Sequence, residues 1–290
     1  MRVFSESADL LALSPDWTGE RFPDGRPRVD DSVLQDLSEA TTEQAWSVLH
    51  AHGYDRQFAG GWLQTNPGKV IAGRALTAQF LPHRPDLDHA AVQAGARRGH
   101  SEPDRQNSWV IEHLVGGDVL VVDIFGKVVE GTVVGDNLGT AVAARTGVGA
   151  VIDGGVRDLQ GLMRLGNVNI FMRDVDPTPI RNVTLVGVNI PIRVGPASVL
   201  PGDVVLGTPS GVSFIPAHLA HAVAEASQEI RVRDRFGKLR LSEGAYTSAQ
   251  IDLPQWSPAI EADFAHWRQN PENASGLDGP GESARKGEVR

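Results

Sequence analysis

Two charged residues stand side by side directly after a predicted buried strand. Residues 150–153 (AVID) form this strand, which is expected to break at Gly154 and Gly155 just before Arg157 and Asp158. An arginine guanidinium binds a carboxylate through two parallel hydrogen bonds, whereas an aspartate cannot bind that anion. The aspartate suits a hard divalent cation such as Mg²⁺, which takes few protein ligands and several waters. The pair therefore predicts an anion clamp beside a metal carboxylate.

A second polar turn, residues 135–138 (GDNL), precedes an Ala-rich helix predicted over residues 140–145. Unpaired backbone N–H groups and the macrodipole favour an anion at a helix N-terminus, and Asn137 and Leu138 would offer such donors. Asp136 adds another carboxylate suited to a cation. Because each polar turn adjoins the end of a helix or strand, we expect both turns at one edge of a sheet. Together they describe a site for a 2-oxo acid.

Strands and helices must position these turns. The run DVLVVD at residues 118–123 is a continuous β-branched stretch, as expected of a strand buried on both faces. A helix start with a capping box is predicted at residues 41–44. Further strands are predicted at residues 75–80, 166–172, 183–192, 204–206 and 212–215, and helices at residues 33–37, 88–97 and after Pro216.

Four segments of the chain together resemble the RraA-like family, which includes the 4-hydroxy-4-methyl-2-oxoglutarate aldolases and has often been labelled dimethylmenaquinone methyltransferase-like. The segments are GDNLGTAVAARTGVGAVIDGGVRD (135–158), IAGRALTAQF (71–80), GGDVLVVD (116–123) and PGDVVLGTPSGVSFIP (201–216). The resemblance implies an α/β fold, a three-layer β/β/α sandwich of the swivelling-domain type. It also implies assembly as a homotrimer or homohexamer, with sites between subunits.

The resemblance assigns roles to the residues of the two turns. Arg157 would hold the substrate carboxylate together with the backbone amides of Asn137 and Leu138. Asp158 would ligate Mg²⁺ or Mn²⁺, and Asp136 would hold a water that serves in proton transfer. These roles imply a metal-dependent carbon–carbon lyase.

In this family a carboxylate from a neighbouring subunit normally completes the outer shell of the metal. Glu243, in the run KLRLSEG, is the candidate for that role. The family commonly has an acidic turn where this chain has residues 207–211 (GTPSG), and the chain is longer at both ends than compact members.

Composition excludes several other classes of protein. The chain of 290 residues has no cysteine, which removes disulfides, thiolate metal sites and a cysteine nucleophile. Its net charge of −9 and the lack of a Lys/Arg cluster argue against nucleic acid as a partner. No apolar run is long enough to span a membrane, and the first residues do not resemble a signal peptide. We expect a cytoplasmic protein.

The predicted organisation is one domain with two extended ends. Residues 1–40 form an N-terminal arm, residues 41–252 the RraA-like catalytic domain, and residues 253–290 a C-terminal extension that is largely disordered after about residue 270. Residues 82–109 form either a loop that selects substrate or an ordinary surface excursion. His218, His221 and Glu225 share one helix face, which is more readily a solvated face than a metal site.

The function predicted from these features is cleavage of 4-hydroxy-2-oxo acids to pyruvate, with decarboxylation of oxaloacetate through the same pyruvate enolate. One alternative is a non-catalytic regulator of the RraA type that binds a protein partner. Another is a sugar-acid lyase or decarboxylase, suggested by the extended segment at residues 82–109. A metal carboxylate at Asp158 favours catalysis, because a binding module does not need one.

Overall fold

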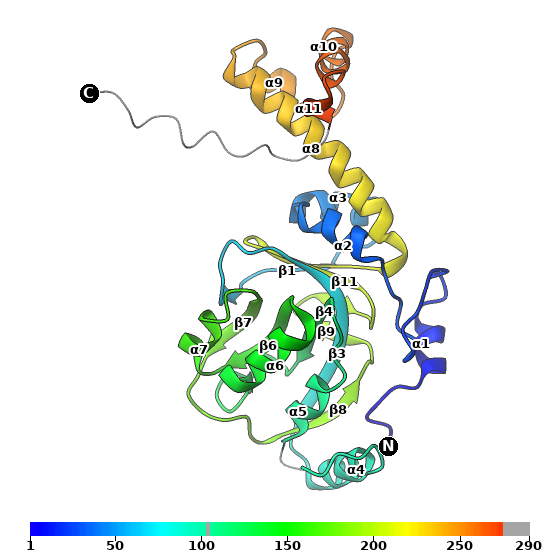
Figure 1. Ribbon diagram of the computed structural model, residues 1–290, viewed down its shortest axis with the longest axis vertical. Coiled ribbons are helices and arrows are strands. Elements are labelled where there is room, and N and C mark those ends of the chain that lie inside the picture. The colour runs from blue at the N-terminus through cyan, green and yellow to red at the C-terminus, as the bar shows by residue number, and fades with distance from the viewer. Residues whose placement is uncertain (103–104, 275–290) are drawn as a thin grey trace, which may run out of the picture. The chain divides into compact units, whose positions relative to one another are not determined.

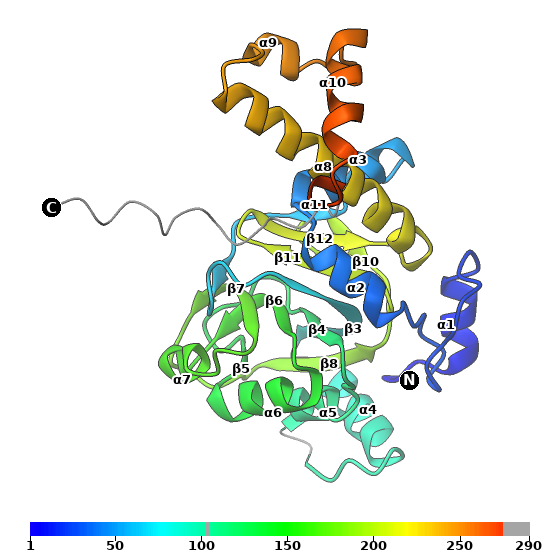
Figure 2. The ribbon, with the colours of Figure 1, turned by 45° about the horizontal axis from the view of Figure 1, so that its top comes forward.

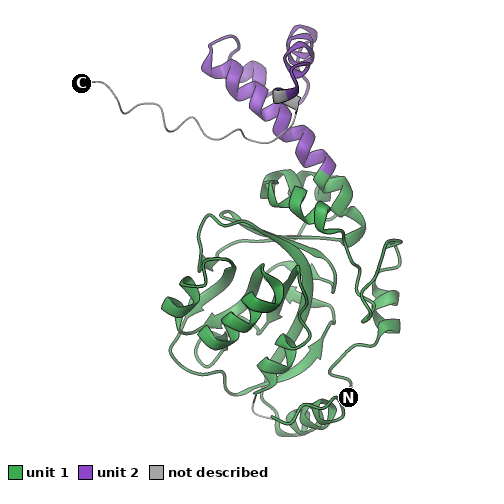
Figure 3. Ribbon diagram, viewed as in Figure 1, with its two compact units in different colours: residues 1–224 green, residues 225–290 purple. Residues whose placement is uncertain are grey.

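The computed structural model describes residues 1–102 and 105–274 and divides the chain into two compact units. The first unit comprises residues 1–224, and the second begins at Glu225 (Figure 3). This division does not coincide with the predicted boundaries at residues 40 and 252, since the predicted arm belongs to the first unit. The disorder predicted after about residue 270 falls mostly on residues 275–290, which lie outside the described residues.

The first unit has a mixed α/β fold built on one large sheet (Figure 1). Among the described residues, ten strands form this sheet: β1 (Phe58–Ala59), β2 (Leu63–Gln64), β3 (Ile71–Pro82), β4 (Asp118–Asp123), β5 (Thr132–Val134), β6 (Gly149–Val156), β7 (Asn169–Val175), β8 (Val183–Val188), β11 (Val204–Thr208) and β12 (Gly211–Ile215). Strands β3, β4, β6 and β7 are parallel neighbours, and β5 pairs with the end of β6. Strands β9 (Ile192–Val194) and β10 (Ala197–Val199) form a separate hairpin.

The helices of the first unit are α1 (Ser7–Leu13), α2 (Asp31–Ser38), α3 (Thr42–Ala51), α4 (Pro85–Ala96), α5 (Gln106–Ile111), α6 (Asp136–Thr146), α7 (Leu159–Met163) and the 3-10 helix η2 (Ala217–Leu219). Helix α8 (Ala220–Ser242) begins in this unit and continues into the second. Helix α3 starts at the predicted capping box, in which the hydroxyl of Thr41 accepts a hydrogen bond from the Gln44 amide.

Alternate residues of the central strands serve two different cores. In β4, Leu120 and Val122 face the core that α4, α5, α6 and α7 cover, whereas Val119 and Val121 face β9, β10, β11 and β12. This arrangement contains the predicted β/β/α layers, and Figure 2 shows α5 and α6 on the helical face. Helices α2 and α3 and the start of α8 form a third core with β11 and β12, so a further helical layer covers the sheet there.

Strand β6 does not break at the glycine pair, contrary to the prediction. It continues to Val156, with a shift of register against β7 between Ile152 and Gly155. A Cβ atom at Gly154 would lie 2.2 Å from Cγ2 of Ile124, and one at Gly155 would lie 2.8 Å from the Val128 carbonyl oxygen. The glycines therefore allow residues 124–131 to cross closely over the strand.

The N-terminal segment is fixed to the sheet by a buried ion pair. Arg26 and Asp118 are 1% and 0% exposed, and two guanidinium nitrogens of Arg26 donate to the Asp118 carboxylate at 3.0 and 3.1 Å. The Arg26 Nε donates to Asp24 at 2.7 Å. Burial raises the pKa of Asp118, although Arg26 opposes that shift. The predicted arm is thus part of the folded core of its unit.

The described part of the second unit is a small helical assembly with an aromatic core. It contains most of α8, followed by α9 (Ser248–Ile251), α10 (Pro258–Arg268) and α11 (Pro271–Ala274). Phe236 and Phe264 pack edge to face with ring centroids 5.3 Å apart. Throughout the part of the chain that the structure describes, no helix has the length and hydropathy required to cross a bilayer.

Candidate active site

The two polar turns lie together because the strands before them pair. Val134 at the end of β5 is the register partner of Val156 at the end of β6, and the Arg157 amide donates to the Val134 carbonyl oxygen at 3.0 Å. Parallel strands end at the same sheet edge, so residues 135–138 and 157–158 leave it side by side. The structure therefore brings the two predicted turns into contact.

Two glycines permit this close approach. A Cβ atom at Gly135 would lie 2.5 Å from Oδ2 of Asp158 and 3.1 Å from Nε of Arg157. A Cβ atom at Gly161, in α7, would lie 2.6 Å from Cβ of Asp136. Any larger residue at either position would displace one of the three predicted site residues.

Asp158 adopts an unusual backbone conformation at the centre of the site. Its φ and ψ angles of 55° and 38° are left-handed, which costs a residue other than glycine about 1 kcal/mol or more. Its Oδ2 lies 3.7 Å from Nε of Arg157, and the two side chains are 40% and 43% exposed. Such strain persists where the surrounding structure holds it, and it is common at functional sites.

The start of α6 differs in two respects from the expectation. Helix α6 begins at Asp136 rather than Thr140, with Gly135 as its N-cap. The Asn137 amide is not free, because it donates to Oδ1 of Asp136 at 2.8 Å. Among the described residues, no acceptor binds the Leu138 amide. An anion at this helix end would therefore meet one open donor and one donor shared with the neighbouring carboxylate.

A cleft of about 310 Å³ opens at this sheet edge, and three arginines line it. Arg157 is one of them, and Arg105 and Arg181 approach from the segments before α5 and β8. Asn107 also lines the cleft, held by a bond from its Nδ2 to the Val133 carbonyl oxygen at 2.8 Å. The sequence motifs did not predict that Arg181 lines this cleft.

The available carboxylates suit a metal of one particular kind. Within residues 1–102 and 105–274, no group of three or more His, Cys, Asp or Glu residues could hold a metal ion. An all-protein cage is therefore absent from the described chain. A half-exposed carboxylate such as Asp158 fits Mg²⁺ or Mn²⁺, because Mg²⁺ in particular is usually held by one or two carboxylates, waters and substrate oxygens.

Glu243, the other predicted metal residue, lies in the second unit. Its Oε2 accepts a hydrogen bond from Arg240 at 2.8 Å. The same arginine binds both carboxylate oxygens of Asp263, at 2.7 and 2.8 Å. A contribution of Glu243 to the site of a neighbouring subunit stays a prediction.

The family model described as RraA-like, Aldolase/RraA, matches residues 34–213, which include both turns and the whole large sheet except the end of β12. The chain belongs to the RraA-like family. Residues 253–274, with α10 and α11, lie outside the match, and so do the buried Arg26 and its neighbours.

Curated relatives of this RraA-like chain are distant. A putative 4-hydroxy-4-methyl-2-oxoglutarate aldolase from Halalkalibacterium halodurans is 28% identical over 128 residues, which is 44% of this chain and 60% of the relative. Protein DlpA from Legionella pneumophila is 26% identical over 219 residues, or 74% of this chain and 32% of that protein. The matches thus span less than two thirds of either relative.

Experimental structures share the fold. RraAS2 from Streptomyces coelicolor, described as an unusual member of the RNase ES inhibitor RraA protein family, is 26% identical, with a TM-score of 0.62. The alignment covers 73% of this chain and 100% of RraAS2. An uncharacterized protein from Pseudomonas syringae pv. tomato has a TM-score of 0.64 at 23% identity, covering 80% of this chain and 98% of that one.

Proposed function

We propose that the cleft cleaves a 4-hydroxy-2-oxo acid to pyruvate in a reaction that depends on a divalent cation. One observation supports this most: three arginines line a cleft beside the half-exposed Asp158. Guanidinium groups and a helix N-terminus favour a carboxylate, and the aspartate favours a cation. A 2-oxo acid offers a carboxylate to the first set and two oxygens to the cation.

Each side chain has a definite task in this proposal. Arg157 binds the substrate carboxylate through two hydrogen bonds, with the Leu138 amide as a further donor. Asp158 holds Mg²⁺ or Mn²⁺, which would polarise the 2-oxo group when bound. Asp136 orients the water that takes up and returns protons, and the Asn137 amide holds the Asp136 carboxylate in place.

The reaction balances without a further reagent. The C3–C4 bond breaks, its electron pair passes to C3 as the enolate of pyruvate, and the C4 hydroxyl loses its proton as C4 becomes a carbonyl carbon. The enolate is then protonated at C3. Oxaloacetate loses carbon dioxide to give the same enolate, so one site performs both reactions. The positive charge of Arg157 stabilises the enolate as it forms.

A regulator that binds a protein partner is the second candidate. RraAS2 is the observation in its favour, because it is described as a member of an inhibitor family and the alignment covers its whole chain. Such a regulator would use the outer surface of the fold and would not need Asp158 or a cation. A sugar-acid lyase belongs to the first proposal, because it would use the same site with a different substrate.

Assembly as a homotrimer or homohexamer belongs to the proposal as well. A carboxylate from a neighbouring subunit, such as Glu243, would complete the metal shell only in such an assembly. Residues 41–252 would then form the catalytic part, and residues 253–290 would be an extension.

A coupled pyruvate assay tests the proposed function. Oxaloacetate and a set of 4-hydroxy-2-oxo acids are supplied with Mg²⁺ or Mn²⁺, and again after addition of chelator. We expect pyruvate release that chelator stops and added cation restores. Absence of release with every substrate and both cations would contradict a lyase and favour the regulator.

A further inference from the structure

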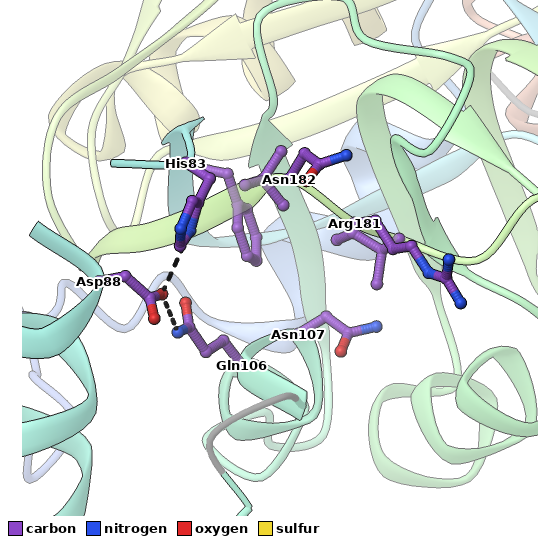
Figure 4. Close-up of a pocket in the computed structure, with 9 residues that line it drawn as sticks. His83, Asp88, Gln106, Asn107, Arg181 and Asn182 are labelled. Carbon is purple, nitrogen blue, oxygen red and sulfur yellow. Dashed lines mark hydrogen bonds and ion pairs between the residues drawn. The ribbon is translucent and has the colours of Figure 1, made fainter. Parts of the chain in front are cut away.

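A second cavity of about 480 Å³ adjoins the arginine-lined cleft. The two share Asn107, Ile180 and Arg181 in their linings, so they are neighbouring cavities. The second cavity is lined mainly by residues from the segment at 82–109 and from the loop before β8 (Figure 4). The distal end of a longer substrate held by Arg157 would therefore have the second cavity as its neighbour.

The far wall of this cavity presents a fixed carboxylate. Asp88 lies in α4, and its Oδ1 accepts hydrogen bonds from Nε2 of Gln106 at 2.9 Å and from the hydroxyl of Thr184 at 3.1 Å. Gln106 is only 8% exposed, and its Oε1 accepts from the Leu185 amide at 2.6 Å. Because both ends of Gln106 are bound, it holds Asp88 in one orientation.

The two oxygens of the Asp88 carboxylate differ in their partners among the described residues. Among the described residues, no donor reaches its Oδ2, while Nδ1 of His83 lies 4.0 Å from Oδ1. Figure 4 shows the His83 ring and the Gln106 amide both directed toward the Asp88 carboxylate. This wall therefore offers a strong acceptor beside an imidazole, which can donate or accept.

The charges of the two cavities differ. Three arginines line the first, whereas the second has Asp88 opposite Arg181, whose guanidinium points away from Asp88 in Figure 4. A second carboxylate placed at the far wall would face the Asp88 carboxylate, and like charges at close range are destabilising. A hydroxyl group can donate to Oδ2 of Asp88 and accept from His83.

We propose that this second cavity selects 4-hydroxy-2-oxo acids whose distal carbons carry hydroxyl groups, with Asp88 and His83 as the recognising residues. The inference rests on the proposed function, since Arg157 must hold the 2-oxo acid end. It makes the substrate a chain-extended, sugar-acid-like molecule rather than a dicarboxylate. Retro-aldol cleavage then yields pyruvate and a hydroxylated aldehyde.

Three six-carbon substrates of equal length test the inference. They are 4,5,6-trihydroxy-2-oxohexanoate, 4-hydroxy-2-oxohexanedioate and 4-hydroxy-2-oxohexanoate, each assayed for pyruvate with Mg²⁺ beside oxaloacetate. We expect kcat/KM for the trihydroxy acid to exceed the other two by about tenfold or more, the effect of one hydrogen bond to a charged group. Equal or better use of the dicarboxylate or the unsubstituted chain would overturn the inference.

Variants assign the preference to the cavity. Asp88→Asn should lower the ratio of kcat/KM for the trihydroxy acid to that for the dicarboxylate by about tenfold, because the repelling charge is removed. The matched control is Asp86→Asn in the same helix turn, where the carboxylate binds exposed Arg84, and it should keep the wild-type ratio. His83→Gln leaves the contacts of Asp88 with Gln106 and Thr184 intact. It should lower the ratio of kcat/KM for the trihydroxy acid to that for 4-hydroxy-2-oxohexanoate.

A binding measurement separates the inference from catalysis. Calorimetry with chelator present stops turnover, and the trihydroxy acid should still bind wild-type protein more tightly than the dicarboxylate, with the difference lost in Asp88→Asn. If the protein decarboxylates oxaloacetate but does not prefer the trihydroxy acid to the dicarboxylate, only the inference is overturned. No pyruvate from any substrate, oxaloacetate included, would overturn the proposed function and the inference with it.

Discussion

Two arginine–aspartate pairs in this chain have the same chemistry and opposite surroundings. Arg26 and Asp118 are almost fully buried and are joined by two hydrogen bonds near 3 Å. Arg157 and Asp158 are 43% and 40% exposed, and their nearest charged atoms are 3.7 Å apart. In the first pair the two charged groups bind each other and Arg26 also binds Asp24, whereas the second pair leaves hydrogen-bonding capacity open to a ligand.

The difference follows from the burial of the first pair and from the adjacency of the two residues of the second pair in the sequence. A buried ion pair must be complete, because an unpaired charge in the interior is strongly unfavourable. Residues adjacent in sequence, such as Arg157 and Asp158, are poorly placed to bind each other, and the left-handed backbone of Asp158 turns its side chain beside Gly135. The contrast predicts that mutations in one pair change stability and mutations in the other change activity.

The largest effect is expected for Asp158→Ala. Loss of the proposed metal ligand should lower metal-dependent pyruvate release by about a thousandfold or more, since several kcal/mol of charge stabilisation disappear. The free energy of unfolding should change little, because the pair is half exposed. Asp174→Ala, at another exposed aspartate, is the control and should keep wild-type turnover. Full turnover in Asp158→Ala would remove Asp158 from the site.

The next effect is expected for Arg26→Ala, in the free energy of unfolding. Removing one partner of the buried pair should lower it by about 3–5 kcal/mol, because Asp118 would remain buried and unpaired. Urea unfolding measures this. Arg28→Ala, at an arginine 39% exposed and paired with Glu20, should cost about 1 kcal/mol or less.

A double replacement tests the buried pair in a second way. Arg26→Met combined with Asp118→Leu removes both charges and should recover most of the lost stability, since apolar residues of similar size often replace buried ion pairs well. If the single variant Arg26→Ala were as stable as wild type, the buried pair would not hold the N-terminal segment to the sheet.

A smaller, pH-dependent effect concerns Asp203, another buried carboxylate, for which the described residues provide no arginine partner. Burial raises its pKa to about 7, opposed only in part by backbone donors at Leu200 and Ala217. The folded state therefore keeps this proton when the unfolded state has lost it, and the free energy of unfolding falls as pH rises from about 4 to about 7.

The variant Asp203→Asn tests that titration. The stability of the variant relative to wild type should increase between pH 5 and pH 7 and level off at higher pH, because the amide does not ionise. Urea unfolding of both proteins at several pH values measures the difference. A difference that stays constant with pH would show that Asp203 does not titrate in this range.

Much of the fold could be predicted from local pattern. The strand at Asp118–Asp123 is as predicted, because a run of buried β-branched residues has few other conformations. The path of β6 through its glycines was predicted wrongly, since the crossing of residues 124–131 depends on segments distant in sequence. The boundary between the two units after Ala224 could not be predicted from the sequence, because helix α8 continues across it.

Only part of the candidate site could be predicted, because some of its contacts follow from strand pairing and others depend on the paths of loops. The contact between the two turns follows from strand pairing, which the residue types and the family resemblance both indicated. The contributions of Arg105 and Arg181 required the path of two loops, and neither loop has a periodic pattern. The bond between the Asn137 amide and its neighbour Asp136 depends on a single side-chain rotamer, which sequence does not specify.

The central claim is that Asp158 and the arginine cleft bind a divalent cation and a 2-oxo acid together. Electron paramagnetic resonance of Mn²⁺ tests this directly, with oxalate as a stable mimic of the pyruvate enolate. We predict that oxalate tightens Mn²⁺ binding to the wild-type protein and has no such effect on Asp158→Ala. Mn²⁺ binding that ignores oxalate, or that is equal in the two proteins, would contradict the account.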